Sequence, residues 1–170
     1  MSQLNILTYP DKFLSKHAKQ VANIDGAIQK IIDDMALTMY EAPGIGLAAM
    51  QVGIDKSILV YDIAPRDEKK SLQVLINPKI ITSEGSTISE KEGCLSVPDF
   101  RADVKRSDFV LVEGVDRKEK PVRIEAQGSL AVVLQHEIDH LNGILFIDHI
   151  SGLKKKLYKN RVKKKLRKNE

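Results

Sequence analysis

The sequence is poor in cysteine and lacks a long apolar run. Cys94 is its one cysteine, which excludes an internal disulfide framework and favours a reducing compartment. No stretch is long and apolar enough to predict a membrane span, and residues 1–5 lack the basic start of a secretory signal. We therefore expect a cytoplasmic protein with no membrane partner.

The composition is that of a globular protein. Apolar residues make up 42% and charged residues 29% of the chain, and 170 residues predict one domain spanning 1–170. The charge is uneven: residues 151–170 hold ten Lys or Arg and one acid, a net charge of +9, whereas residues 1–150 have 17 basic and 22 acidic residues. This basic tail should be attracted to a polyanion in a salt-dependent way.

A His-Glu-x-x-His pattern is the strongest chemical signal. His136 and His140 are four residues apart, a spacing that places both imidazoles on one face of a helix, and Glu137 follows the first of them. The flanking residues predict a helix that begins near 127–129 and ends near 142–143. The pair suits a metal ion, and the glutamate could reach a water molecule on that ion. The alternative is a buried helix whose histidines make only local hydrogen bonds.

A catalytic metal site typically has three protein ligands, which leave one position of the metal open for water or substrate, so a third ligand is needed here. A thiolate is a good ligand, so Cys94 is favoured, although a lone cysteine is usually a small buried hydrophobic residue. Asp148 and His149 remain possible by chemistry alone. The histidine that an extended zinc-protease motif would need at position 146 is Phe146 instead.

The remaining pattern predicts an α+β fold. Apolar spacing indicates helices over residues 27–40 and, in the basic tail, over 151–168. Strand patterns cover 57–63, 73–81, 104–115 and 121–126, and the last two form a hairpin. The absence of regular β-α-β alternation argues against a parallel doubly wound sheet.

Residues 44–51 include two glycines and two alanines and carry no charge, so their backbone can approach a ligand closely. A phosphate-binding loop is excluded, because no Gly-Lys-Ser/Thr follows. Gln51 is the polar side chain of this run. It is either structural or directed at a substrate oxygen.

Three stretches together resemble, in order and spacing, the signature motifs of bacterial peptide deformylases: GIGLAAMQ (44–51), EGCLS (92–96) and QHEIDH (135–140). The resemblance implies mixed, mainly antiparallel sheets around a central helix that carries the histidines. It also implies that Cys94, His136 and His140 bind one metal ion per chain. The first motif commonly has Thr where this chain has Met50, and we expect activity to survive this difference.

The resemblance further implies an enzyme that removes the N-formyl group from the formylmethionine of new polypeptides. A hydroxide on the metal would attack the formyl carbon and release formate, with Glu137 as general base and then acid. The Gln51 amide and the Leu95 N–H would stabilise the oxyanion. Cys/His/His spacing alone suggests zinc, but the resemblance indicates Fe(II), for which zinc, nickel or cobalt can substitute.

The same resemblance assigns substrate-binding roles to Gly46, Gly93, Arg101, Val132 and Val133. The valines lie within a turn of the first histidine and could also be ordinary core residues. Arg101 could equally make a surface salt bridge.

The expected partners are formylmethionyl nascent peptides and the ribosome near its exit tunnel, which the basic C-terminal helix would contact, and a monomer is expected. A zinc endopeptidase is the main alternative function. A cysteine hydrolase would leave both histidines and the glutamate unexplained, and an RNA-binding protein with a structural metal has only the basic tail in its favour.

Overall fold

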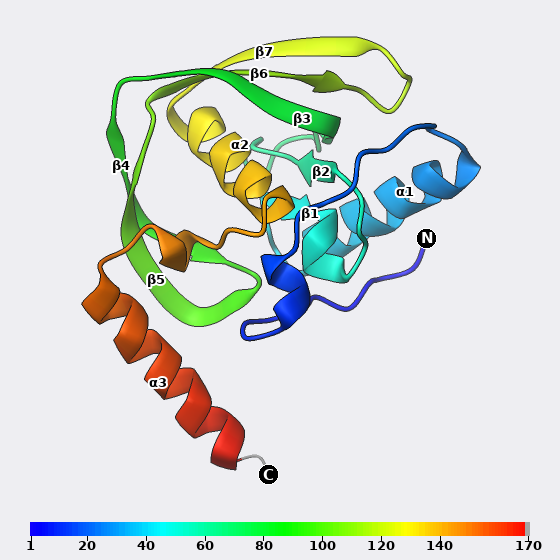
Figure 1. Cartoon of the computed structure of the whole chain (residues 1–170). Helices are drawn as coiled ribbons and strands as arrows, with labels where there is room; N and C mark the ends of the chain where they lie inside the picture. Colours follow the sequence, from blue (N-terminus) through cyan, green and yellow to red (C-terminus); the bar gives the residue numbers. More distant parts are fainter. Residues whose placement is uncertain (169–170) are drawn as a thin grey trace.

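Residues 1–168 are described by a computed structural model with an α+β architecture (Figure 1). The α-helices are α1 (Gly26–Glu41), α2 (Gly128–Leu141) and α3 (Gly152–Lys168). The strands are β1 (Gly46–Ala48), β2 (Ile58–Tyr61), β3 (Gln73–Glu84), β4 (Thr87–Cys94), β5 (Val97–Arg106), β6 (Phe109–Val115) and β7 (Pro121–Gln127). Three 3-10 helices complete the fold: η1 (Lys12–Ser15), η2 (Ala49–Val52) and η3 (Phe146–Asp148).

The strands form two antiparallel sheets. Five strands pair in the order β1-β2-β3-β6-β7, and β4 pairs with β5 in a separate two-stranded sheet. Alternate residues of β2 point to opposite faces, as expected for a strand. Leu59 and Tyr61 pack in the core that includes α2, whereas Ile58 and Val60 pack in the core that includes α1.

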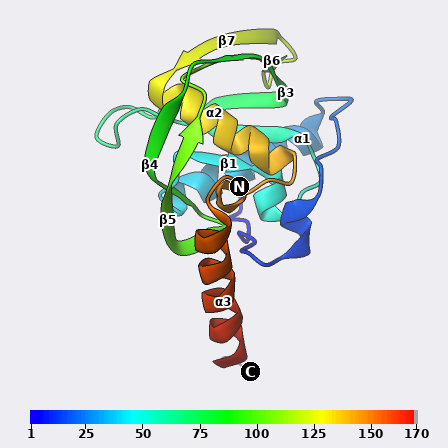
Figure 2. The ribbon, with the colours of Figure 1, turned by 60° about the vertical axis from the view of Figure 1, so that its left-hand side comes forward.

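The central helix α2 lies between the five-stranded sheet and the β4–β5 hairpin (Figures 1 and 2). Leu134, Ile138 and Leu141 supply its apolar stripe to the sheet core. The helix begins at Gly128 and ends at Leu141, with Asn142 as its C-cap, as the flanking residues predict. The helix predicted over 27–40 is likewise confirmed as α1, and the Asp25 side chain caps it by accepting a hydrogen bond from Ile28 N.

The strands differ from the prediction in several places. The strand predicted over 104–115 is wrong: the chain leaves the hairpin after Arg106 and joins the larger sheet as β6 at Phe109. Gln135 of α2 holds this crossing point, because its amide donates to Ser107 O at 2.8 Å and its oxygen accepts from Ser107 N at 2.9 Å. In addition, β1 and β4 form where no strand is predicted.

The basic tail forms the predicted helix as far as Lys168, and the last two residues of the predicted tail, 169–170, lie outside the described residues. It extends away from the body of the molecule below β5 (Figure 2). Tyr158, 3% exposed, packs against the hairpin, but Leu153 and Leu157 are 70% and 61% exposed. The leucine stripe therefore does not form a single packed face. Within residues 1–168, every helix falls short of the length and apolar character that a membrane crossing requires.

Candidate metal centre and active site

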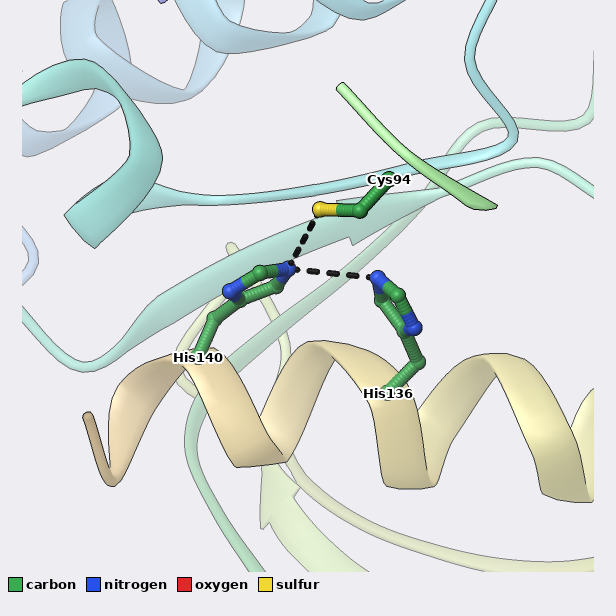
Figure 3. Close-up of side chains that lie close together, drawn as sticks. All are labelled: Cys94, His136 and His140. Carbon is green, nitrogen blue, oxygen red and sulfur yellow. Dashed lines mark hydrogen bonds between the residues drawn. The ribbon is translucent and has the colours of Figure 1, made fainter. Parts of the chain in front are cut away.

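Three donor side chains converge between α2 and the end of β4 (Figure 3). His140 Nε2 lies 3.2 Å from Cys94 Sγ and 3.2 Å from His136 Nε2. All three donor atoms lie within 4.8 Å of one another. The helix supplies two imidazoles on one face, and the tight turn after Cys94 returns the chain into β5. The structure thus brings together the three residues for which the sequence predicts metal binding.

Of the alternative third ligands, neither lies in this cluster. Asp148 accepts a hydrogen bond from Leu145 N at 2.9 Å. His149 Nε2 lies 2.7 Å from Asp139 Oδ2. Both side chains thus contact groups outside the cluster.

The donor chemistry fits a transition metal. A thiolate and two imidazoles are ligands that zinc and iron accept. Burial lowers the pKa of His140 well below its ordinary value, and the neutral ring is the form that binds metal. At His136, burial also opposes the charged form, but hydrogen bonds to Cys94 and Glu92 outweigh it and raise the pKa. An ion must therefore compete with a proton at His136.

A buried ionic network orients His136. Its Nδ1 lies 2.6 Å from Glu92 Oε1, and Arg106 holds the same carboxylate through two contacts of 2.5 and 3.2 Å. Burial would raise the pKa of Glu92, but these two partners outweigh it and hold the pKa at about 2. Arg106 also donates to Asp139 Oδ2 at 2.6 Å. Such a carboxylate fixes the tautomer and direction of a metal-binding histidine.

Sequence reasoning missed this network. Glu92 precedes Cys94 by two residues in a strand, so both side chains point to the same side, and that spacing could have identified the glutamate. No comparable local signal predicts Arg106, which reaches the carboxylate from the other strand of the hairpin.

Gln51 faces the metal cluster from η2 and is 2% exposed. Its oxygen accepts a hydrogen bond from Ala48 N at 2.9 Å, which fixes the direction of the amide. Its Nε2 lies 3.2 Å from Ser96 Oγ and 3.5 Å from Cys94 Sγ. The oxygen of the amide thus makes a structural contact, and its nitrogen is directed at the metal cluster. Ser96, fully buried, is a third residue, after Glu92 and Arg106, whose place in the site sequence reasoning missed.

Glu137 is buried against the backbone of β1. A Cβ atom on Gly46 would lie 2.8 Å from its carboxyl carbon, so a glycine is required there. Its Oε2 finds no hydrogen-bond partner among the described residues. Burial is the main cause that raises the pKa of Glu137 to about 7. A group with that pKa can accept and release a proton near neutrality.

A cavity of about 850 Å³ joins these groups. Its lining includes His136, Glu137, Cys94, Gln51 and Leu95. All the residues predicted to bind substrate also line it: Gly46, Gly93, Arg101, Val132 and Val133. Met50 does not; it is fully buried in the core beneath α2.

The guanidinium group of Arg101 lies over Gly93. A Cβ atom on that glycine would be 3.2 Å from the guanidinium carbon, and Arg101 Nη1 donates to Lys91 O at 3.2 Å. The arginine is thus held by a backbone carbonyl.

A cysteine sulfur and two imidazoles converge beside a buried carboxylate, and Cys94, His136 and Glu137 line one cavity. This arrangement defines the class of metal-dependent hydrolases. The family model described as polypeptide deformylase matches residues 3–156. The chain belongs to this family.

Individual relatives agree with the family assignment. The chain is 52% identical over 147 residues to the peptide deformylase of Desulfosudis oleivorans, an alignment that covers 86% of this chain and 85% of the relative. The crystal structure of a peptide deformylase from Legionella pneumophila is 42% identical, with a TM-score of 0.90 and coverage of 99% of this chain and 98% of the other. The Ehrlichia chaffeensis enzyme in complex with actinonin also has a TM-score of 0.90, at 42% identity, and covers 97% of this chain and 98% of the other.

Proposed function

We propose that this chain hydrolyses the N-formyl group from the N-terminal formylmethionine of newly synthesised polypeptides and releases formate. The observation that carries the proposal is the convergence of Cys94, His136 and His140 beside the buried Glu137, at the base of a cavity in a polypeptide deformylase fold. A zinc endopeptidase is not favoured, because the relatives over most of the chain are peptide deformylases.

Cys94, His136 and His140 would hold one metal ion. When bound, that ion supplies a Lewis acid that polarises the formyl carbonyl and lowers the pKa of a water molecule toward neutrality. We propose Fe(II) as the native ion, with zinc, nickel or cobalt able to substitute. The donor set supports binding of a metal of this group, because thiolate and imidazole suit all four ions.

The proton transfers are assigned to Glu137. Its pKa of about 7 lets the carboxylate take a proton from the attacking water and return it to the departing amine. The free Oε2 atom supports this role, because no hydrogen bond to the described residues has to break first. The Gln51 amide, fixed by Ala48, and the Leu95 N–H would donate to the developing oxyanion.

The cavity walls would bind the methionine and the peptide behind it. Val132 and Val133 offer an apolar surface on α2 next to His136. Gly46 of β1 and Gly93 of β4 line the same cavity, and Arg101 stands at the same wall.

We further propose that residues 1–170 act as one catalytic domain, a monomer in the cytoplasm, whose helix α3 contacts the ribosome near its exit tunnel. The ten basic residues of 151–170 support attraction to ribosomal RNA. Changing the exposed Lys156, Lys163 and Lys164 to glutamate should weaken salt-sensitive ribosome binding. Unchanged affinity, compared with the same reversal at the exposed residues Lys69, Lys118 and Lys120, would refute the contact.

The deformylase assignment is tested by formate release from an N-formylmethionyl tripeptide, with protein purified without oxygen and loaded with Fe(II) or Ni(II). Glu137→Gln should bind metal and fold but lose nearly all activity, whereas Glu125→Gln, an exposed change on β7, should not affect it. No formate from folded, metal-loaded protein would overturn the assignment. Cleavage of an internal bond in an unformylated peptide would indicate the endopeptidase instead.

A further inference from the structure

Two cationic side chains stand at the rim of the cavity on the β4–β5 hairpin. Lys91 of β4 and Arg101 of β5 both line the cavity and are both exposed. They are tied together, because Arg101 Nη1 donates to the carbonyl oxygen of Lys91. The rim therefore carries two adjacent positive charges, one on each strand of the hairpin.

Neither cation is neutralised by an ion pair within residues 1–168. Asp103 is near, but its carboxylate accepts a hydrogen bond from Lys91 N and does not line the cavity. Asp99 lines the cavity and is already paired with Lys165 of α3 at 3.4 Å.

The two acids deeper in the cavity do not offset this charge at the rim. Glu92 is buried and neutralised by Arg106 and His136. Glu137 is buried beside the metal cluster, away from the exposed rim. A peptide that enters the cavity thus first meets a net positive wall.

The position of this wall along a bound peptide follows from strand geometry. Lys91 lies three residues before Cys94 in β4, a separation of roughly 10 Å along an extended chain. Arg101 lies over Gly93, one residue from the cysteine. An extended peptide also advances about 3.3 Å per residue, so a chain whose formyl group is at the metal places its second and third residues beside these cations.

We propose that Lys91 and Arg101 make this enzyme select formylmethionyl chains with Asp or Glu at the second or third residue. This inference rests on the proposed function. A carboxylate there gains attraction from two unpaired cations, whereas a lysine is repelled. Because the rim is exposed, the preference should be about three- to tenfold in kcat/KM at low salt. It should act mainly on KM, since the rim is remote from the reacting bond.

The test compares isosteric peptides. N-formyl-Met-Asp-Ala and N-formyl-Met-Asn-Ala differ in one charge, as do N-formyl-Met-Ala-Asp and N-formyl-Met-Ala-Asn. All four carry a C-terminal amide, because a free terminal carboxylate would itself meet the cations. We expect the Asp peptide of at least one pair to have the higher kcat/KM with Ni(II)-loaded protein. The ratio should fall toward one in 1 M salt, where the Debye length is about 3 Å.

Two charge reversals on the hairpin locate the effect. Lys91→Glu should bring the Asp/Asn ratio to one or below and raise activity on a matching lysine peptide. Lys105→Glu is the control with the same change in charge. Lys105 is exposed on β5 between the buried Val104 and Arg106, and it does not line the cavity. It should retain the wild-type ratio.

A second readout does not depend on turnover. The unformylated peptides Met-Asp-Ala and Met-Asn-Ala, both amidated, should inhibit with the same preference for the acidic residue. Rapid hydrolysis of the Asn and Asp peptides at equal kcat/KM, with equal inhibition, would overturn the inference and leave the deformylase assignment standing. Failure to hydrolyse any of the four peptides would overturn both.

Discussion

Replacing the buried carboxyl of Glu137 by an amide should stabilise the metal-free protein at alkaline pH. Burial raises the pKa of Glu137 from 4.5 to about 7, so folding disfavours its charged form. When folding raises the pKa of an acid, the protein keeps its full stability at pH values below the pKa of that acid in the unfolded chain. Stability is then lost as the pH rises toward the pKa of the acid in the folded protein. The affected window is therefore about pH 4.5 to 7.

The size of the effect follows from the shift. One pKa unit corresponds to about 1.4 kcal/mol, so ionising Glu137 at pH 8 costs the folded state about 3 kcal/mol. Glutamine has the same shape as the protonated acid and never ionises. The difference in free energy of unfolding between Glu137→Gln and wild type should thus grow by about 2 to 3 kcal/mol from pH 5 to pH 8. In a chain of this length that is roughly 5–10 °C in Tm.

The assay is thermal or urea unfolding of chelator-treated protein at several pH values, with Glu125→Gln as the exposed control. All other titrating groups are shared by the two proteins, so the change of the difference with pH isolates residue 137. Metal-loaded samples should show a smaller change, because a nearby cation favours the carboxylate. A difference that is independent of pH in the metal-free protein would refute the view that Glu137 is held as a neutral acid.

Three other substitutions test the contacts around the candidate site and the packing of the β4–β5 hairpin. Gly46→Ala places a methyl group 2.8 Å from the carboxyl carbon of Glu137, so kcat should fall roughly a hundredfold while metal content, measured by elemental analysis, stays unchanged. Tyr158→Ala removes a ring that is 3% exposed from the core of the hairpin and should cost about 3 kcal/mol in urea unfolding. Arg106→Leu leaves Glu92 buried with His136 as its remaining partner, and should cost about 3–5 kcal/mol by the same measurement.

The sequence could predict those parts of the site that depend on local geometry. The spacing of His136 and His140 requires a helix, and the apolar residues and the terminal glycines around them indicate its limits, which α2 follows. Cys94 could be favoured as a third donor from chemistry, but only the fold places its sulfur 3.2 Å from a histidine on a distant helix.

The β4–β5 hairpin was less predictable for a physical reason. The residues of β4 are polar and charged, and the two register shifts in its pairing with β5 interrupt the alternation that indicates a strand. The break at Ser107 was also hidden, because residues on both sides of it have strand patterns. The break is held by Gln135, which lies on α2 and hydrogen-bonds to Ser107. A contact between residues so far apart in the sequence leaves no local pattern.

The three donors of the candidate metal centre belong to two different layers of the molecule. Cys94 ends a strand of the small sheet, whereas both histidines lie on the helix that packs on the large one, and the two sheets share no strand pairing. An ion held by all three would act as a cross-link between positions 46 residues apart. By analogy with a disulfide, closing such a loop restricts the unfolded chain by about 4 kcal/mol. Loss of the ion would then loosen one wall of the substrate cavity from the other, so chelation should impair peptide binding as well as the chemical step.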